Sequence, residues 1–461
     1  MEPSLGGRCP VGVARAVSAS RGHLGGRDNA LMNSPRFTRR IGWLIAGAVA
    51  LTLATTLVAV NFVGAEKKIE RRIDKAYPLA DPRFRHELGV MLGPQFVNGN
   101  KVQVLRNGDE IFPAMLAAIR AAEKSITFET YIYWSGEIGR EFATALTERA
   151  RSGVKVHVLL DWVGSAKMDD SLLETMTAAG VQVQKFHPPH WSHLGRLNNR
   201  THRKLLVADG RVAFTGGVGI APEWTGNAQD PAHWRDSHFR VEGPVVAQMQ
   251  AVFLDNWIKV SGDVLHGPAY FPALAKAGDS EAQMFSSSPS GGSESMQLMY
   301  MLVIAGATRA IDLSAAYFVP DDLTLRALLD ALKRGVKLRI VVPGPHIDSD
   351  AVRNASRALW GPLLAAGAAI AEYQPTMYHC KVMIVDNLLV SVGSTNFDNR
   401  SFRLNDEATL NIHDDAFARE QTAIFEADLA QARVVSYAAW SARPWQERAA
   451  ERFASLIGSQ L

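Results

Sequence analysis

Two copies of one short motif hold the residues of this chain that could do chemistry. Each copy has a histidine, a lysine two residues later and an aspartate five residues after the lysine: His202, Lys204 and Asp209, and His379, Lys381 and Asp386. A neutral imidazole can attack phosphorus and form a phosphohistidine, while a protonated one can give its proton to a departing alcohol. Two ammonium groups can hold the negative oxygens of a phosphodiester. The motif pair therefore indicates phosphodiester chemistry, which by this logic requires no metal and no other cofactor.

The spacing within the motif predicts where these side chains point. Alternate residues of a strand face the same way, so the histidine and lysine of each copy are expected on one side of a strand. The residues after the lysine, 205–208 and 382–385, are apolar and read as buried strand. Each aspartate then falls at the strand end, where its carboxylate can orient neighbouring groups. The alternative is two ordinary buried strands whose histidines are satisfied internally, and the duplication argues against it.

The elements that must position the motifs are also repeated along the chain. Strands and a helix alternate before each motif, in an order typical of an α/β sheet. The predicted ranges are strand 126–133, helix 138–151 and strand 154–160, and later helix 296–307, strand 311–319, helix 323–334 and strand 336–342. The paired helices end alike at Gly153 and Gly335, the residue type that most often ends a helix. We therefore expect two lobes, residues 97–265 and 266–461, that bring both motifs to one pocket.

The composition fits a globular protein of two domains with one unusual segment. The chain has 461 residues, of which 47% are hydrophobic and 21% are charged. The net charge of +3 is smaller than expected for a nucleic-acid-binding protein, so no nucleic-acid partner is expected. The two cysteines, Cys9 and Cys380, lie in different contexts and predict no disulfide framework.

The unusual segment is the uncharged run 41–63. As a helix, its 23 residues would span about 34 Å, enough for the core of a bilayer. We favour an uncleaved transmembrane anchor of open orientation over a cleaved signal peptide or a buried soluble helix. Residues 1–40 are predicted to be disordered. Residues 64–96 are predicted to hold a basic juxtamembrane helix, around Ile69 to Tyr77, and a linker.

The two motifs resemble the HKD signature of the phospholipase D superfamily. The run Gly393-Ser394-Thr395-Asn396 matches the Gly-Ser-x-Asn element of that family, and residues 379–406 are similar to bacterial cardiolipin synthases. The resemblance covers most of the chain from Asn98 onward. It implies a fold of two α/β/α lobes related by pseudo-twofold symmetry, with the active site at their seam.

The resemblance also implies residues that support the histidines. In this family an acidic residue on a later strand orients each histidine, and the matching candidates are Asp236 and Glu407. Ser394 and Asn396 match the downstream element of the second half. In the first half Gly219 stands where the family often has asparagine, so the two halves are unequal.

The function implied by the resemblance is the synthesis of cardiolipin from phospholipids. A phosphatidyl group of one phosphatidylglycerol would pass to a histidine, by analogy His202, and a second phosphatidylglycerol would displace it with His379 as acid/base. The alternatives are a phospholipase D hydrolase, a nuclease or other phosphodiesterase, and a membrane scaffold without activity. A single-pass protein of a bacterial inner membrane is expected, and its oligomeric state stays open. The histidine-rich loop 187–193 is expected at the pocket mouth rather than at a metal site.

Overall fold

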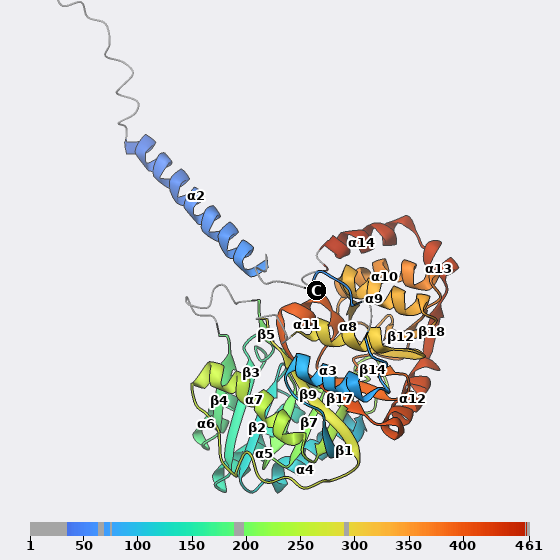
Figure 1. Ribbon diagram of the computed structural model, residues 1–461. Coiled ribbons are helices and arrows are strands. Elements are labelled where there is room, and N and C mark those ends of the chain that lie inside the picture. Colours follow the sequence, from blue (N-terminus) through green and yellow to red (C-terminus); the bar gives the residue numbers. More distant parts are fainter. Residues whose placement is uncertain are drawn as a thin grey trace, which may run out of the picture. The chain divides into compact units, whose positions relative to one another are not determined.

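The structure is a computed structural model that describes residues 35–62, 69–73, 76–188, 198–289, 295–456 and 458 (Figure 1). The chain divides into two compact units, Met1–Val60 and Asn61–Leu461, and the second unit holds both motifs.

One long helix, α2 (Pro35–Phe62), accounts for the described part of the first unit. It includes residues 35–40, which the sequence predicts to be disordered, while residues 1–34 lie outside the described ranges. Over the residues whose side chains the structure describes, no helix is both long and apolar enough to cross a membrane.

The helix expected between residues 64 and 96 lies later in that stretch than the spacing around Ile69 predicts. The described residues from 69 to 77 are not helical, and α3 (Pro82–Leu92) follows them. Pro82 suits the first turn because it has no backbone N–H to leave unpaired. Asp81 caps the same turn by accepting a hydrogen bond from the backbone N–H of Arg83 at 2.9 Å. The helix therefore begins where its cap is.

The second unit is built on a sixteen-stranded sheet and a small two-stranded one. The strands of the first half are β1 (Val97–Arg106), β2 (Ser125–Thr130), β3 (Lys155–Asp161), β4 (Gln182–Phe186), β5 (Arg200–Thr201), β6 (Leu205–Ala208), β7 (Val212–Gly216) and β8 (Ser237–Glu242). Those of the second half are β9 (Ser280–Ser287), β10 (Ala310–Ala315), β11 (Phe318–Val319), β12 (Lys337–Pro343), β13 (Ala369–Tyr373), β14 (Lys381–Val385), β15 (Leu389–Gly393), β16 (Phe397–Asp398), β17 (Asn405–His413) and β18 (Ala432–Val435).

The strand order is the same in both halves. From the antiparallel contact between β1 and β9 at the centre, the sheet runs through β8, β7, β6, β2, β3 and β4 on one side. On the other side it runs through β17, β15, β14, β10, β12 and β13, with β18 added at the outer edge. The two motif strands thus have corresponding neighbours: β6 lies between β7 and β2, and β14 lies between β15 and β10. This repeated order is the arrangement expected of two halves related by pseudo-twofold symmetry.

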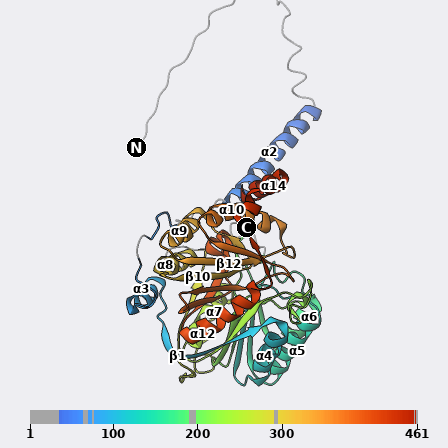
Figure 2. The same cartoon turned by 90° about the vertical axis from the view of Figure 1, so that its right-hand side faces the viewer.

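Helices cover both faces of this sheet (Figures 1 and 2). The remaining helices are α4 (Asn107–Ala121), α5 (Glu137–Arg151), α6 (Asp170–Ala178), α7 (Val246–Ser261), α8 (Met296–Gly306), α9 (Asp322–Lys333), α10 (Asp350–Ala365), α11 (Asn399–Arg403), α12 (Asp415–Leu429), α13 (Tyr437–Ser441) and α14 (Trp445–Leu456), with a 3-10 turn, η2 (Pro222–Trp224). Apolar residues of α4 and α5 pack in one core with the first half of the sheet, and those of α8 and α9 pack in another with the second half. A third core contains residues of both α7 and α12 and joins the two halves.

The apolar residues of each motif are buried on both faces of the sheet, as their sequence predicts. In β6, Leu205 and Val207 belong to the core that joins the halves, whereas Leu206 and Ala208 belong to the core of the first half. In β14 the residues of 382–385 alternate between two cores in the same way. Each motif is therefore held by a strand that is rigidly packed on both sides.

The motif aspartates lie in the turns that follow these strands. The carboxylate of Asp386 accepts hydrogen bonds from the backbone N–H groups of Thr308, Arg309 and Ala310 at 2.9, 2.7 and 2.9 Å, and from the Thr308 hydroxyl at 2.8 Å. Asp209 likewise accepts from the backbone of residues 123–125, at 2.7 to 3.2 Å. Each aspartate thus ties the end of the motif strand to the chain that enters the neighbouring strand.

An Asp386→Ala variant is expected to lower the free energy of unfolding by about 3 kcal/mol, because it leaves several partly buried N–H groups without an acceptor. The backbone of Asp386 has a φ of 56°, which alanine adopts less readily, and this adds to the loss. Asp386→Asn keeps one side-chain acceptor and tolerates this backbone, so a smaller loss is expected. Urea unfolding in detergent measures the free energy of unfolding of the unchanged chain, Asp386→Ala and Asp386→Asn. Replacement of the exposed Asp279 by alanine is the matched control. Equal stability of Asp386→Ala and Asp279→Ala would contradict this role.

Candidate active site

Both motif histidines precede their strands rather than lying within them. His202 follows β5 and comes three residues before β6, and His379 comes two residues before β14. The prediction that histidine and lysine share one side of a strand is therefore wrong in its local structure: of these four residues only Lys381 is in the strand. The physical reason is that the chain before each motif strand leaves its own half to pair with the other half.

Backbone pairing across the halves places each histidine. β5 pairs in parallel with β17, and the backbone N–H of His202 donates to the carbonyl oxygen of Asp406 at 2.9 Å. In the corresponding contact of the second motif, Tyr378 forms a parallel bridge with Arg235 of the first half. The N–H of His379 donates to the carbonyl oxygen of Arg235 at 2.8 Å. The two histidines are thus set by the same kind of contact at the seam between the halves.

Each histidine has its carboxylate partner in the other half of the chain. Nδ1 of His202 lies 3.0 and 3.1 Å from the two carboxylate oxygens of Glu407. Nδ1 of His379 lies 2.7 Å from Oδ2 of Asp236. When Nδ1–H donates to a carboxylate, the lone pair of the neutral ring is on Nε2, the nitrogen that can attack or accept a proton. The structure therefore pairs the two predicted acids with the two histidines, in exchanged halves.

Burial keeps both imidazoles neutral near pH 7. Burial lowers the pKa of His202 to about 4, although the charge of Glu407 opposes this shift. The pKa of His379 is also lowered, first by burial and then by the charge of Lys381, and Asp236 opposes these effects. Glu407 and Asp236 stay ionised, because the pKa of each is lowered overall. Burial acts to raise these pKa values, but the combined effect of the adjacent histidines and lysines is larger and in the opposite direction.

The two motif lysines belong to the same electrostatic cluster. Burial, followed by the charge of Lys381, lowers the pKa of Lys204 to about 7. Burial also lowers the pKa of Lys381 itself, with Asp236 opposing. Each ammonium group donates to the backbone carbonyl of its own histidine, at 2.8 Å for Lys204 and 2.9 Å for Lys381. Because Lys381 acts on groups of the other half, the two motifs form one site.

The motif aspartates lie at the opposite ends of the motif strands from the lysines. Asp386 is the fifth residue after Lys381, a separation of roughly 16 Å along a strand. The structure thus brings together the histidines, the lysines and the two supporting acids, and it leaves Asp209 and Asp386 outside the cluster.

The two acids are held by different groups, so the site is not symmetric. Ser394 donates its hydroxyl proton to Glu407 at 2.6 Å. The corresponding residue after β7 is Gly217, where an added Cβ would lie 2.3 Å from Oδ1 of Asp236. Asp236 instead accepts a hydrogen bond from the indole N–H of Trp224 at 3.0 Å. The glycine is needed because Asp236 occupies the space that a side chain there would take.

Aromatic rings border both histidines. The ring of Tyr131 lies 5.2 Å from that of His202, and the rings of Trp224 and Trp234 lie 5.3 and 5.4 Å from that of His379. The two tryptophans were not identified from the sequence as site residues. Their nearness to Asp236 in the chain was the available signal, since Trp234 is only two residues before it.

Asn396 is buried, and among the described residues it forms no hydrogen bond with either histidine. Its backbone N–H is 3.3 Å from the hydroxyl of Ser401, and its side-chain oxygen has no hydrogen-bond partner among the described residues. Most of the histidine-rich loop 187–193 lies outside the described residues, since only His187 and Pro188 are included. Within the described ranges, no group of three or more His, Cys, Asp or Glu side chains could hold a metal ion.

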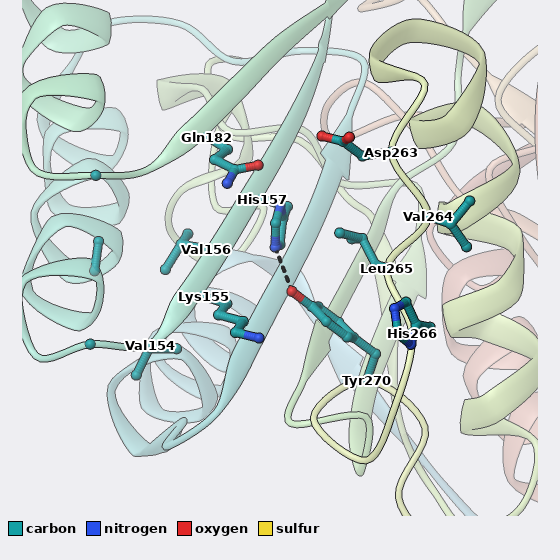
Figure 3. A pocket seen from close by; sticks show the side chains of 13 residues that line it. Val154, Lys155, Val156, His157, Gln182, Asp263, Val264, Leu265, His266 and Tyr270 are labelled. Atoms are coloured by element: carbon teal, nitrogen blue, oxygen red, sulfur yellow. Dashed lines mark hydrogen bonds between the residues drawn. The ribbon is translucent and has the colours of Figure 1, made fainter.

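A pocket of about 580 Å³ lies in the first half of the sheet, at the strand ends away from the motif histidine. Figure 3 shows His157 and Tyr270 in it, with Nε2 of His157 2.7 Å from the Tyr270 hydroxyl. Thr127 of β2 pairs with His157, whereas Glu129 of β2 pairs with Leu205, the first strand residue after the motif lysine. The pocket therefore lies at the starts of β3 and β4, the strand ends away from His202.

Comparisons with known proteins identify relatives of this chain. A family model described as "Cardiolipin synthase, PLD-like domain" matches residues 115–257 and 300–429. The chain is 36% identical over 372 residues to "Cardiolipin synthase A" of Pseudomonas fluorescens, covering 80% of this chain and 76% of that protein. It is 35% identical over 365 residues to "Cardiolipin synthase" of Geobacillus kaustophilus, covering 78% and 72%. Its fold is similar to the crystal structure of phosphatidylserine synthase from Haemophilus influenzae Rd KW20, with a TM-score of 0.63, 13% identity, and coverage of 82% of this chain and 100% of that one.

Proposed function

The chain belongs to the cardiolipin synthase family with a PLD-like domain, and from this premise we propose how its residues perform the reaction. It is a cardiolipin synthase-type phosphatidyltransferase of the phospholipase D superfamily. The single observation that carries the proposal is the exchanged pairing of His202 with Glu407 and of His379 with Asp236, which leaves two Nε2 atoms for the reaction.

In the proposed first step, Nε2 of His202 attacks the phosphorus of one phosphatidylglycerol. A nitrogen–phosphorus bond forms, the bond from phosphorus to the glycerol oxygen breaks, and His379 gives its proton to that oxygen. His202 suits attack because burial lowers its pKa to about 4 and keeps it neutral. His379 must gain a proton, and the negative charge of a bound phosphate raises its pKa in the complex with substrate.

In the proposed second step, His379 accepts the proton from a hydroxyl of a second phosphatidylglycerol. The hydroxyl oxygen then bonds to phosphorus and the nitrogen–phosphorus bond to His202 breaks, which yields cardiolipin. Lys204 and Lys381 hold the non-bridging phosphate oxygens, where negative charge develops in both transition states. Asp209 and Asp386 act as positioning residues through the backbone contacts at the strand ends.

The proposed roles give a defined pH dependence. His202 must be neutral, so activity falls as pH decreases through about 4. On the alkaline side two groups must hold their protons: Lys204, whose pKa is about 7, and the general acid His379, whose pKa burial lowers, so activity falls as either of them is deprotonated. The quantity to measure is kcat/KM, with dilute phosphatidylglycerol in zwitterionic micelles. Lys204→Arg keeps its charge at all these pH values, so the decrease that belongs to Lys204 is expected to disappear while the one that belongs to His379 remains. The alkaline side of the profile therefore becomes less steep, even if the maximal rate is lower. An alkaline side as steep in Lys204→Arg as in the unchanged chain would contradict the role of Lys204.

The proposed reaction is tested by incubating the purified chain in mild detergent with phosphatidylglycerol as the only lipid substrate. Cardiolipin and glycerol in equal amounts, both lost in His202→Ala and His379→Ala, are the expected products. Phosphatidic acid without cardiolipin would identify water as the acceptor and a hydrolase instead. If neither product forms, phosphatidylglycerol is not the donor and the proposal is overturned.

Membrane attachment through residues 41–63 is part of the proposal, because both substrates are lipids. The run is uncharged and long enough for a bilayer core, and α2 covers all of it except Val63. The expected result is that the full chain stays with membranes after extraction at alkaline pH, whereas a chain that begins at Glu66 is released. Release of the full chain would overturn a membrane-spanning anchor.

A further inference from the structure

The last described helix, α14, contacts the second half through a buried glutamate, and among its apolar residues only one alanine joins a buried cluster. Glu451 on its inner side is only 1% exposed and pairs with Arg443 at 2.7 Å and with Arg357 of α10 at 3.1 Å. Glu447 pairs with the same arginine at 2.8 Å. Ala454 is the other buried residue of the helix. Figures 1 and 2 show α14 at the surface, beside α10.

The outer side of α14 carries the large apolar residues. Trp445, Phe453 and Leu456 are 68%, 72% and 77% exposed. At 100° per residue these positions, with Ala449, fall within about 80° of one another and opposite Glu451. A surface helix normally turns its apolar side to the core and its charged side to solvent. In α14 the two sides are reversed.

Basic residues lie beside this apolar stripe. Arg452 falls about 20° from Trp445 on the outer side, and Arg448 falls about 60° from Trp445 on its flank. Both arginines are exposed, whereas both acidic residues of the helix, Glu447 and Glu451, are engaged on the inner side. The outer face with this flank therefore combines aromatic and aliphatic side chains with two positive charges and no negative one. This composition is typical of helices that lie in the interface of an anionic bilayer.

We propose that the outer face of α14, defined by Trp445, Arg448, Arg452, Phe453 and Leu456, lies in the headgroup region of a phosphatidylglycerol-containing bilayer. A second copy of this chain fits the face less well. A twofold contact places each patch against its own copy, so the arginines of two helices would face one another without an acidic partner. An anionic lipid surface supplies the opposite charge and accepts the apolar side chains together.

The course of the chain supports the same placement, and this step rests on the membrane attachment proposed above. A pocket of about 610 Å³ is lined by Ser455 and Gly458, at the end of α14, and also by Ile69 and Glu70. Ile69 is six residues after Val63, so at most about 20 Å of chain separates it from the end of the apolar run. The end of α14 thus lies beside the part of the chain that must be near the membrane surface.

The test places a fluorescent probe on two positions of the same helix in the full chain. Phe453→Cys puts an NBD label on the outer face, and Ala450→Cys puts it at an exposed position on the side of the helix. Both are made in a Cys9→Ser chain, in which the remaining Cys380 is buried, and the chain without an added cysteine gives the background. The proteins are reconstituted in vesicles of equal parts phosphatidylglycerol and phosphatidylcholine. Quenching by brominated acyl chains and by aqueous iodide is then measured.

The expected result is that brominated lipid quenches the label at 453 at least about twofold more than the label at 450, with iodide giving the opposite order. Exchanging Arg448 and Arg452 for glutamine is expected to weaken lipid quenching at 453, as are vesicles of phosphatidylcholine alone. Equal access of iodide to both labels would overturn the proposal. Shielding from iodide without lipid quenching would also overturn it and would indicate a protein contact. Cardiolipin synthesis by the same labelled chains in detergent tests the catalytic proposal separately.

Discussion

A His202→Ala variant is expected to form cardiolipin at least about 10³-fold more slowly than the unchanged chain. The variant lacks the proposed nucleophile, and the Nε2 atom of His379 is on the other side of the reaction, where it handles the proton. Glu407 is left buried without its imidazole partner, but the backbone pairing of β5 with β17 does not depend on the side chain of residue 202. The loss is therefore expected in catalysis rather than in folding.

The two histidines are distinguished by the intermediate rather than by the overall rate. His379→Ala is expected to be impaired to a similar extent in cardiolipin formation. After prolonged incubation with lipid radiolabelled in its phosphatidyl group, however, a protein-bound, acid-labile label is expected in His379→Ala, which keeps the nucleophile but slows both steps, and not in His202→Ala. The reverse pattern would assign the nucleophile to His379.

A matched control is available at His266, an exposed histidine that lines the pocket at the other end of the sheet. His266→Ala is expected to retain full cardiolipin formation and the same urea unfolding curve as the unchanged chain. A large loss of activity in this variant would show that the assay responds to histidine replacement in general.

Glu407→Gln and Asp236→Asn are each expected to reduce activity by about 10² to 10⁴-fold, although both replacements preserve shape. An amide can present its NH₂ group to Nδ1 of the histidine. The imidazole then carries its proton on Nε2, which removes the lone pair that must attack phosphorus or accept a proton. The carboxylate also stabilises the imidazolium when it forms, and a neutral amide does this less well.

The exchanged pairing gives this prediction a sharper form. In a His202→Ala chain, adding Glu407→Gln is expected to cost little more, because the group it orients is already gone. In a His379→Ala chain, the same holds for Asp236→Asn. If each acid served the histidine of its own half, the opposite combinations would be non-additive. Cardiolipin formation by the single and double variants, with radiolabelled lipid for the slow ones, decides between the two pairings.

The local pattern of the sequence was sufficient for many of the elements. The helix predicted at 138–151 is α5, Glu137–Arg151, and Ile138, Phe142 and Leu146 are buried on one side of it. The apolar residues of both motifs are buried strands, as predicted. Such features depend on residues a few positions apart, so the period of apolar side chains and a stop at glycine are enough to define them.

The end of β2 is an example of what that pattern leaves open. The apolar residues predict a strand over 126–133, but β2 ends at Thr130. Its antiparallel neighbour β6 begins at Leu205, opposite Glu129, because the preceding residues pair with β17 instead. The length of β2 thus depends on pairing with a strand from the other half, and it cannot be predicted from the residues of β2 alone.

The sequence by itself determined the kind of chemistry, since two histidines, two lysines and their spacing can be read from positions 202–209 and 379–386. It also showed the duplication, and the resemblance to the phospholipase D superfamily pointed to the two supporting acids. Only the tertiary structure decided which acid serves which histidine, because Glu407 is 205 residues from His202 and Asp236 is 143 residues from His379. It likewise decided that α14 turns its charged side inward, where Arg357 of α10 receives its glutamates. Contacts between distant segments depend on how whole elements pack against each other, and local spacing does not encode that packing.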